Sequence, residues 1–285
     1  MSRYKISSAT ESSASVSFFG IPYADFDRTG HWAVWCISKM FEAARIIALY
    51  NGFLNFTKID GREAGMVIVK QQLKLNPKLH EMTLKSKTQL LFEMELLEVG
   101  KTSILYRIQL KDGTSNEILG ENFLKFVRMS RKTRRPMVFP DWFYEMYASF
   151  MKSSNPPVLS KEPLPEIPDN AFKYTVIPNH SDTDRNNHVN QSSYIKFCMD
   201  VATKAALNGH YVHFTEDMCL YASLQWTISY VGESMANDEL HIFTWQKEYK
   251  PGHINFSILL KDRPIFHAST IFDEEAKELR IASRM

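Results

Sequence analysis

Two long stretches of the chain carry apolar residues at helical spacing. The first, residues 32–52, predicts a helix of about 20 residues that ends near Gly52. The second, residues 189–209, predicts another long helix that ends near Gly209. Both stretches are apolar on most sides, and such a helix has to be covered on nearly every face.

Each predicted helix is followed by segments in which apolar and polar residues alternate, as in strands. Turn signals such as Asn76-Pro77, Asp112-Gly113 and Pro251-Gly252 separate these segments. The order predicts, in each half, one long helix wrapped by an antiparallel sheet, which is an α+β fold. The predicted strands cover residues 65–75, 82–99, 103–110 and 118–130 in the first half, and 219–231, 239–250, 254–262 and 265–273 in the second.

A short polar motif occurs just before each predicted helix. The spacing Asp-x-Asp-Arg-x-x-His appears twice, with every pair of matching residues 157 positions apart (188 − 31 = 157), which indicates an internal duplication. The matching residues are Asp25, Asp27, Arg28 and His31 in the first copy, and Asp182, Asp184, Arg185 and His188 in the second.

The segment between the halves predicts a boundary. A short amphipathic helix is expected near residues 141–151, and the five prolines between residues 156 and 168 favour an extended connector. We therefore predict an N-terminal domain at residues 1–150, a proline-rich linker at 151–170 and a C-terminal domain at 171–285.

Composition narrows the class of protein. The chain has 285 residues, of which 44% are hydrophobic and 23% charged, with a formal net charge of +2, as expected for globular domains. The near balance of charge gives no reason to expect nucleic acid as a partner. No apolar run approaches the roughly 18 residues of a membrane span.

Two features bear on location. Three widely spaced cysteines suggest neither a disulfide framework nor a metal site, which favours a reducing compartment. The chain ends in Ser283-Arg284-Met285, which resembles the Ser-Lys-Leu class of peroxisomal signals. The expected location is peroxisomal or, if this ending carries no signal, cytoplasmic.

The second copy of the motif carries groups suited to acyl transfer to water. Asp184 can act as a general base or orient a water molecule, while His188 and Asn186 can position water and polarise a carbonyl. The helix that follows offers backbone N–H groups near Val189 and Asn190 for a developing oxyanion. Ordinary helix capping by Asn186 or Asn187 is the alternative interpretation of the same residues.

The motif also resembles a known active site. Asp182, Asp184, Asn186, His188, Val189, Asn190 and Tyr194 match the active-site segment of the acyl-ACP and acyl-CoA thioesterases of the hotdog fold. Plant-type acyl-ACP thioesterases also carry Tyr-x-x-Glu-Cys on a following strand, and this chain has Tyr230, Glu233 and then Ser234 in place of the cysteine.

The resemblance implies a double hotdog that hydrolyses fatty acyl thioesters, carried by coenzyme A or by acyl carrier protein, without metal or cofactor. It implies one chain with two pseudo-dimeric halves, as a monomer or a homodimer. Catalysis would fall to Asp184, Asn186, His188 and Glu233. Substrate binding would fall to Val189, Asn190, Tyr194, Asp27 and His31, of which the last two belong to the first copy.

Two other functions remain open from the sequence. A duplicated chain whose sites have both become inert would be a non-catalytic acyl-binding protein. An enoyl-CoA hydratase-like enzyme also pairs Asp and His in a double hotdog. Its motif is closer to Asp-x-Asn-Pro-x-His, however, and Asn187 stands here where the proline would be.

Overall fold

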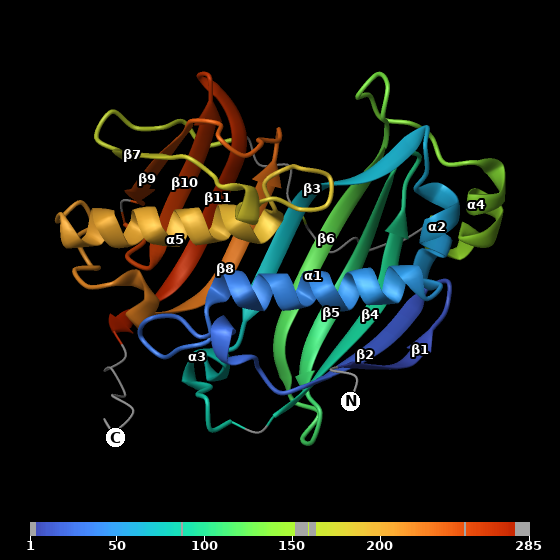
Figure 1. Cartoon of the computed structure of the whole chain (residues 1–285), viewed down its shortest axis with the longest axis horizontal. Coiled ribbons are helices and arrows are strands. Elements are labelled where there is room, and N and C mark those ends of the chain that lie inside the picture. Colours follow the sequence, from blue (N-terminus) through green and yellow to red (C-terminus); the bar gives the residue numbers. More distant parts are fainter. Residues whose placement is uncertain (1–3, 87, 152–158, 160–163, 248, 277–285) are drawn as a thin grey trace. The chain divides into compact units, whose positions relative to one another are not determined.

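The computed structural model describes residues 4–86, 88–151, 159, 164–247 and 249–276. The predicted signal at Ser283-Arg284-Met285 lies outside these residues. By contacts the chain divides into two compact units: the first holds residues 1–20, 40–73 and 87–161, and the second holds residues 21–39, 74–86 and 162–285. Figure 1 labels most of the helices and strands that belong to them. The predicted domain limits remain a prediction, because a contact cluster does not test whether a range folds by itself.

The first unit is built on an antiparallel sheet with the strand order β1-β2-β4-β5-β6-β3. Its strands are β1 (Tyr4–Ala9), β2 (Ser13–Phe19), β3 (Ala64–Leu75), β4 (Gln89–Val99), β5 (Ser103–Asp112) and β6 (Ile118–Ser130). Short helical segments follow α1 and β6: η2 (Phe53–Asn55), α2 (Phe56–Ile59), α4 (Asp141–Met146) and η3 (Ala148–Phe150).

Helix α1 (Val34–Tyr50) is buried or half-buried at every residue except Lys39 and Tyr50. Phe41 packs edge-on against Phe92 of β4, with ring centroids 5.2 Å apart. The guanidinium of buried Arg45 lies over the ring of Phe126 on β6, 5.0 Å from its centre. A helix buried on so many sides has to be covered by more than a flat layer, as the apolar pattern predicts.

The second unit holds an antiparallel sheet with the order β8-β11-β10-β9-β7. Its strands are β7 (Phe172–Val176), β8 (Tyr221–Tyr230), β9 (Leu240–Gln246), β10 (His253–Leu260) and β11 (Arg263–Ala276). Helix α5 (Gln191–Leu207) lies on this sheet, and Tyr194 stacks on Phe266 of β11 with 5.2 Å between ring centroids. The short segments are η1 (Tyr23–Asp25), α3 (Lys78–Glu81), η4 (His180–Asp182) and η5 (Met218–Leu220).

The long helices and most strands agree with the sequence predictions, with three differences. Strands β1, β2 and β7 were not expected, and the strand predicted to begin at Met82 is β4, which begins only at Gln89. The helix predicted at residues 141–151 ends at Met146 and continues as the separate turn η3. Among the described residues, no helix is long and apolar enough to cross a membrane.

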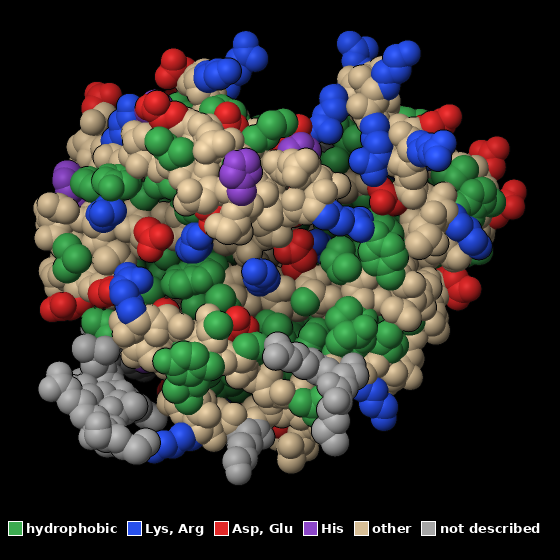
Figure 2. Space-filling model, in the orientation of Figure 1, with side chains coloured by type: hydrophobic (Ala, Val, Ile, Leu, Met, Phe, Trp, Pro, Cys, Tyr) green, Lys and Arg blue, Asp and Glu red, His purple; other side chains and the backbone are tan. Residues whose placement is uncertain are grey.

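The surface carries charges of both signs. On the face drawn in Figure 2, acidic and basic side chains both occur across the surface among apolar and uncharged ones. This distribution agrees with the small formal net charge of +2.

Buried His267 on β11 predicts a loss of stability in acid. The side chain is 6% exposed, neither ring nitrogen has a hydrogen-bond partner, and burial lowers the pKa of His267. The unfolded chain therefore binds a proton more readily, so stability falls as the pH drops below about 6.5 and through the lower folded pKa. We expect His267→Leu to lose less free energy of unfolding than the parent between about pH 7.5 and about pH 5, as measured by urea denaturation. Equal losses in both proteins would contradict this.

Candidate active site

The second copy of the motif forms a tight turn, residues Asp184–His188, which we call the second turn. Asp184 N donates to His188 O at 2.8 Å, and Asn187 N donates to Asp184 O at 3.0 Å. Asn187 has a φ of 63°, a conformation that asparagine tolerates better than most residues. The Asp184 carboxylate accepts Asn186 N at 2.7 Å and His188 N at 3.4 Å through Oδ1, and Asn186 Nδ2 at 3.3 Å through Oδ2.

The first copy forms the same turn, residues Asp27–His31, which we call the first turn. Asp27 N donates to His31 O at 2.9 Å, Gly30 N donates to Asp27 O at 3.0 Å, and Thr29 N donates to Asp27 Oδ1 at 2.8 Å. Gly30 occupies the position that Asn187 occupies in the second turn, and its φ of 84° is likewise positive. The duplication inferred from the sequence is therefore also a repeat of backbone hydrogen bonds.

The first aspartate of each motif has a structural role. Buried Asp182 accepts Asn179 N at 2.9 Å and forms an ion pair with Lys196, while its carbonyl accepts Asn190 N at 2.9 Å. In the first copy, burial raises the pKa of Asp25, and Lys39 opposes that effect. Lys39 stands 157 positions before Lys196, so the aspartate–lysine arrangement is part of the repeat.

Glu233 meets the second turn. It follows β8, and its Oε2 lies 3.5 Å from Nδ1 of His188, with 41% of the Glu233 side chain and 29% of the His188 side chain exposed. A β-bridge between His188 and Met235 and a hydrogen bond of 2.8 Å from Val189 N to Ser234 O hold the two segments together. The structure thus brings Asp184, Asn186, His188 and Glu233 into one partly exposed cluster.

The backbone at the start of α5 differs from the sequence prediction. Val189 N donates to Ser234 O and Asn190 N donates to Asp182 O, so neither N–H is available to an oxyanion. Asn190 is instead the N-cap, and its Oδ1 accepts Ser192 N at 2.8 Å. The prediction failed because it placed the helix start too early. The first residue of α5 is Gln191, whose N–H is one of those that a helix leaves without an intrahelical acceptor.

Tyr194, expected to bind substrate, is buried on the inner side of α5. Its side chain is 4% exposed and its hydroxyl lies 2.8 Å from Ser234 Oγ, while Ser234 N donates to the same hydroxyl at 3.1 Å. Burial raises the pKa of Tyr194. The contacts connect Tyr194 with the residue beside Glu233, a link that the sequence analysis did not find.

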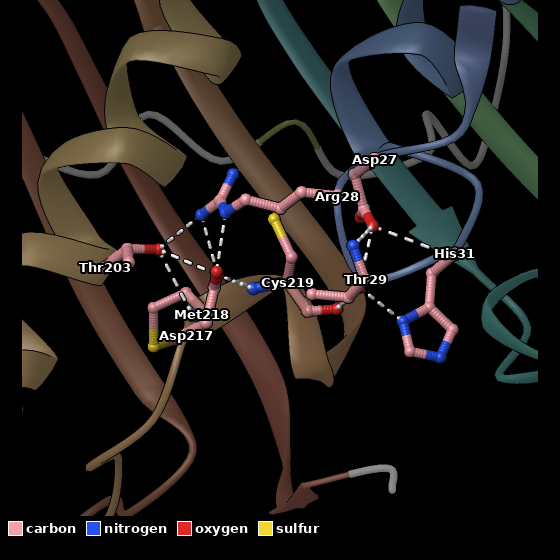
Figure 3. A network of polar contacts seen from close by, with 8 residues as sticks. All are labelled: Asp27, Arg28, Thr29, His31, Thr203, Asp217, Met218 and Cys219. Carbon is pink, nitrogen blue, oxygen red and sulfur yellow. Dashed lines mark hydrogen bonds and ion pairs between the residues drawn. The ribbon is translucent and has the colours of Figure 1, made fainter. Parts of the chain in front are cut away.

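The first turn has a different environment. Thr29 Oγ1 donates to Asp27 Oδ1 at 2.6 Å and lies 2.8 Å from Nδ1 of His31 (Figure 3). The ring of His31 stacks on that of His80, with 3.9 Å between centroids. Asp27 lines a hollow of about 370 Å³ that includes open solvent, together with apolar residues such as Trp32 and Leu79. This hollow lies at the first turn.

Arg28 connects the first turn to the end of α5. It forms two hydrogen bonds of 2.6 and 2.7 Å with the carboxylate of Asp217, which also accepts Thr203 Oγ1 at 3.2 Å (Figure 3). Arg28 and Asp217 are 189 positions apart in the chain. No local pattern signals a contact at such a separation.

Neither a reactive cysteine nor a metal centre is found in the described part of the chain. All three cysteines are free, and burial raises the pKa of each thiol, to about 12 for Cys36. Cys198 is fully buried and is part of the core. Among the described residues, no three His, Cys, Asp or Glu side chains lie together as metal ligands would.

Comparison of sequences finds no protein family and no curated protein that matches the chain. Solved structures do match. An acyl-ACP thioesterase from Bacteroides thetaiotaomicron aligns with a TM-score of 0.70 at 14% identity, over 92% of this chain and 98% of that one. The 12:0-ACP thioesterase from Umbellularia californica aligns with a TM-score of 0.71 at 14% identity, over 92% and 94%. The chain therefore has the double-hotdog fold of these acyl-ACP thioesterases, which confirms the predicted α+β fold class.

Proposed function

We propose that the protein is a thioesterase that hydrolyses fatty acyl thioesters to a free acid and a thiol. The observation that carries the proposal is the His188–Glu233 pair, 3.5 Å apart and partly open to solvent, beside the Asp184 turn. The similar folds of acyl-ACP thioesterases support it further. The proposed thiol is coenzyme A or acyl carrier protein.

In the proposed reaction Glu233 is the general base. Its carboxylate takes a proton from a water molecule, and the resulting hydroxide attacks the thioester carbonyl carbon. The negative charge that develops on the carbonyl oxygen is stabilised by donors at the start of α5, with Gln191 N–H in place of the two N–H groups first expected. The C–S bond then breaks, and protonated Glu233 returns its proton to the leaving sulfur.

The other residues of the cluster have supporting roles in this proposal. His188 holds the Glu233 carboxylate in place, and Asn186 positions water from its exposed place in the turn. Both oxygens of Asp184 already accept hydrogen bonds from its own turn, so Asp184 orients its neighbours rather than acting as the base. Asp27 and His31, in a turn without a matching glutamate, are assigned to substrate contact and not to chemistry.

The test is thiol release from a panel of acyl-CoA and acyl carrier protein thioesters of different chain lengths. Turnover of one class alone would identify the thiol carrier. If the purified protein binds acyl chains but releases thiol from neither class, the protein is a non-catalytic acyl-binding double hotdog and the proposal is wrong.

Asp184→Asn is expected to lower kcat about tenfold, because the amide keeps an oxygen for the N–H of Asn186 but loses the charge that orients the cluster. Steady-state thiol release measures the effect. Asp27→Asn is the equivalent change in the first turn. Its change in Tm shows how much stability the protein loses when such a turn loses its carboxylate. An Asp184→Asn protein with parental kcat would show that Asp184 contributes to the fold and not to catalysis.

A further inference from the structure

The loop after β8 is fixed at both sides of Glu233. On one side, Val231 N and Gly232 N both donate to Ile265 O at 2.9 Å. A Cβ on Gly232 would lie 2.8 Å from Cγ2 of Ile265, so this approach requires glycine. On the other side, Ser234 is held by the hydroxyl of Tyr194. Glu233 lies between these two attachments.

The attachment at Ser234 is made of buried groups. Ser234 is 1% exposed and Tyr194 is 4% exposed, and the Tyr194 hydroxyl bonds both Oγ and N of Ser234. Hydrogen bonds between buried polar groups are costly to break, because water cannot replace the lost partner. The carbonyl of Ser234 also accepts Val189 N, which directly follows His188. Tyr194 and Ser234 therefore connect the segments that carry the two members of the pair.

The first copy lacks this arrangement. The residues 157 positions earlier are Ile37 for Tyr194, Asn76 for Glu233 and Pro77 for Ser234. Ile37 has no hydroxyl, and Pro77 has neither a side-chain donor nor a backbone N–H. The copy without the glutamate is thus also the copy without its attachment, although both copies keep the same turn.

We infer that Tyr194 and Ser234 are positioning residues that hold Glu233 against His188, and that Ser234 is not a nucleophile. This inference rests on the proposed function only where activity is its readout. A serine whose Oγ is buried and bonded to a tyrosine cannot reach a substrate carbonyl without leaving its site. Its hydroxyl instead supplies a partner for the Tyr194 phenol.

Three variants test the inference by kinetics. Tyr194→Phe removes both hydrogen bonds, and we expect kcat to fall about tenfold with KM changed less than about twofold, because Glu233 is displaced while the binding surface remains. Ser234→Ala keeps the hydrogen bond from the backbone N–H of this position to the Tyr194 hydroxyl, so its kcat is expected to fall only about threefold. Ser234→Cys keeps a donor at the same place and is expected to restore most of the activity, which a purely steric role would not require.

Tyr211→Phe is the matched control. Tyr211 is buried in the same unit and its hydroxyl bonds Thr244 on β9, away from the loop of Glu233. The Tyr211→Phe protein loses one buried tyrosine hydrogen bond but keeps the His188–Glu233 pair unchanged, so we expect its kcat to match that of the parent. An equal fall of kcat in Tyr211→Phe and Tyr194→Phe would overturn the inference, because it would reduce the effect to general stability.

A second readout does not need turnover. The imidazole NMR signal of His188, assigned by its loss in His188→Gln, is expected to shift in Glu233→Gln and to shift in the same direction in Tyr194→Phe, but not in Tyr211→Phe. If the parent protein releases no thiol but these shifts occur, the proposed function fails and the positioning role stands. A His188 signal that stays at its parental place in Tyr194→Phe would overturn the positioning role even in an active enzyme.

Discussion

Glu233→Gln is expected to lower kcat for thioester hydrolysis by about a hundredfold or more, with Tm nearly unchanged. The amide has almost the shape of the carboxylate but cannot accept a proton from water, and loss of a general base typically costs 10²- to 10⁴-fold in rate. Glu233 is 41% exposed and pairs with His188, which is itself partly exposed, and charge pairs this open to solvent contribute little to stability. Steady-state thiol release and thermal unfolding measure the two quantities.

Glu239→Gln is the matched control for this prediction. Glu239 forms a second glutamate–histidine pair in this unit, with 3.7 Å between its Oε1 and Nε2 of His241, and its side chain is 66% exposed. The same chemical change at this pair should leave kcat within about twofold of the parent. A Glu233→Gln protein that keeps parental kcat would remove Glu233 from the chemistry and, with it, the mechanism proposed for the pair.

Most of the fold could be predicted from the sequence, because the elements that form the core carry the strongest patterns. Helix α5 buries twelve of its residues, and β6 begins and ends where its alternation does, at Ile118 and Ser130. Two of the three missed strands, β1 and β7, stand at the ends of the strand order in their units and have no buried residue, whereas β2 buries four. An edge strand that buries little has no need of an apolar pattern, so periodicity could not reveal it.

The candidate site was predicted in part. The motif and its resemblance pointed to Asp184, Asn186, His188 and Glu233, which the structure brings together. The hydrogen bonds of Tyr194 and of Val189 N could not be foreseen, since both depend on contacts with Ser234, some 40 residues away. Such contacts are fixed by tertiary packing and leave no spacing in the sequence.

Trp226→Ala is expected to cost the fold about 3–5 kcal/mol in free energy of unfolding, the usual range for removing a fully buried large aromatic side chain. Trp226 on β8 is fully buried, stacks on Phe256 of β10 at 5.7 Å and meets Phe272 of β11 edge-on at 6.4 Å, so its loss opens a cavity shared by three strands. Urea denaturation monitored by circular dichroism measures the loss.

Trp245→Ala is the control. Trp245 is half-buried on β9, and the strand register places it on the opposite face of the same sheet from Trp226, so we expect less than half the effect. Equal losses in the two variants would mean that both faces of this sheet contribute equally to stability and would contradict the prediction.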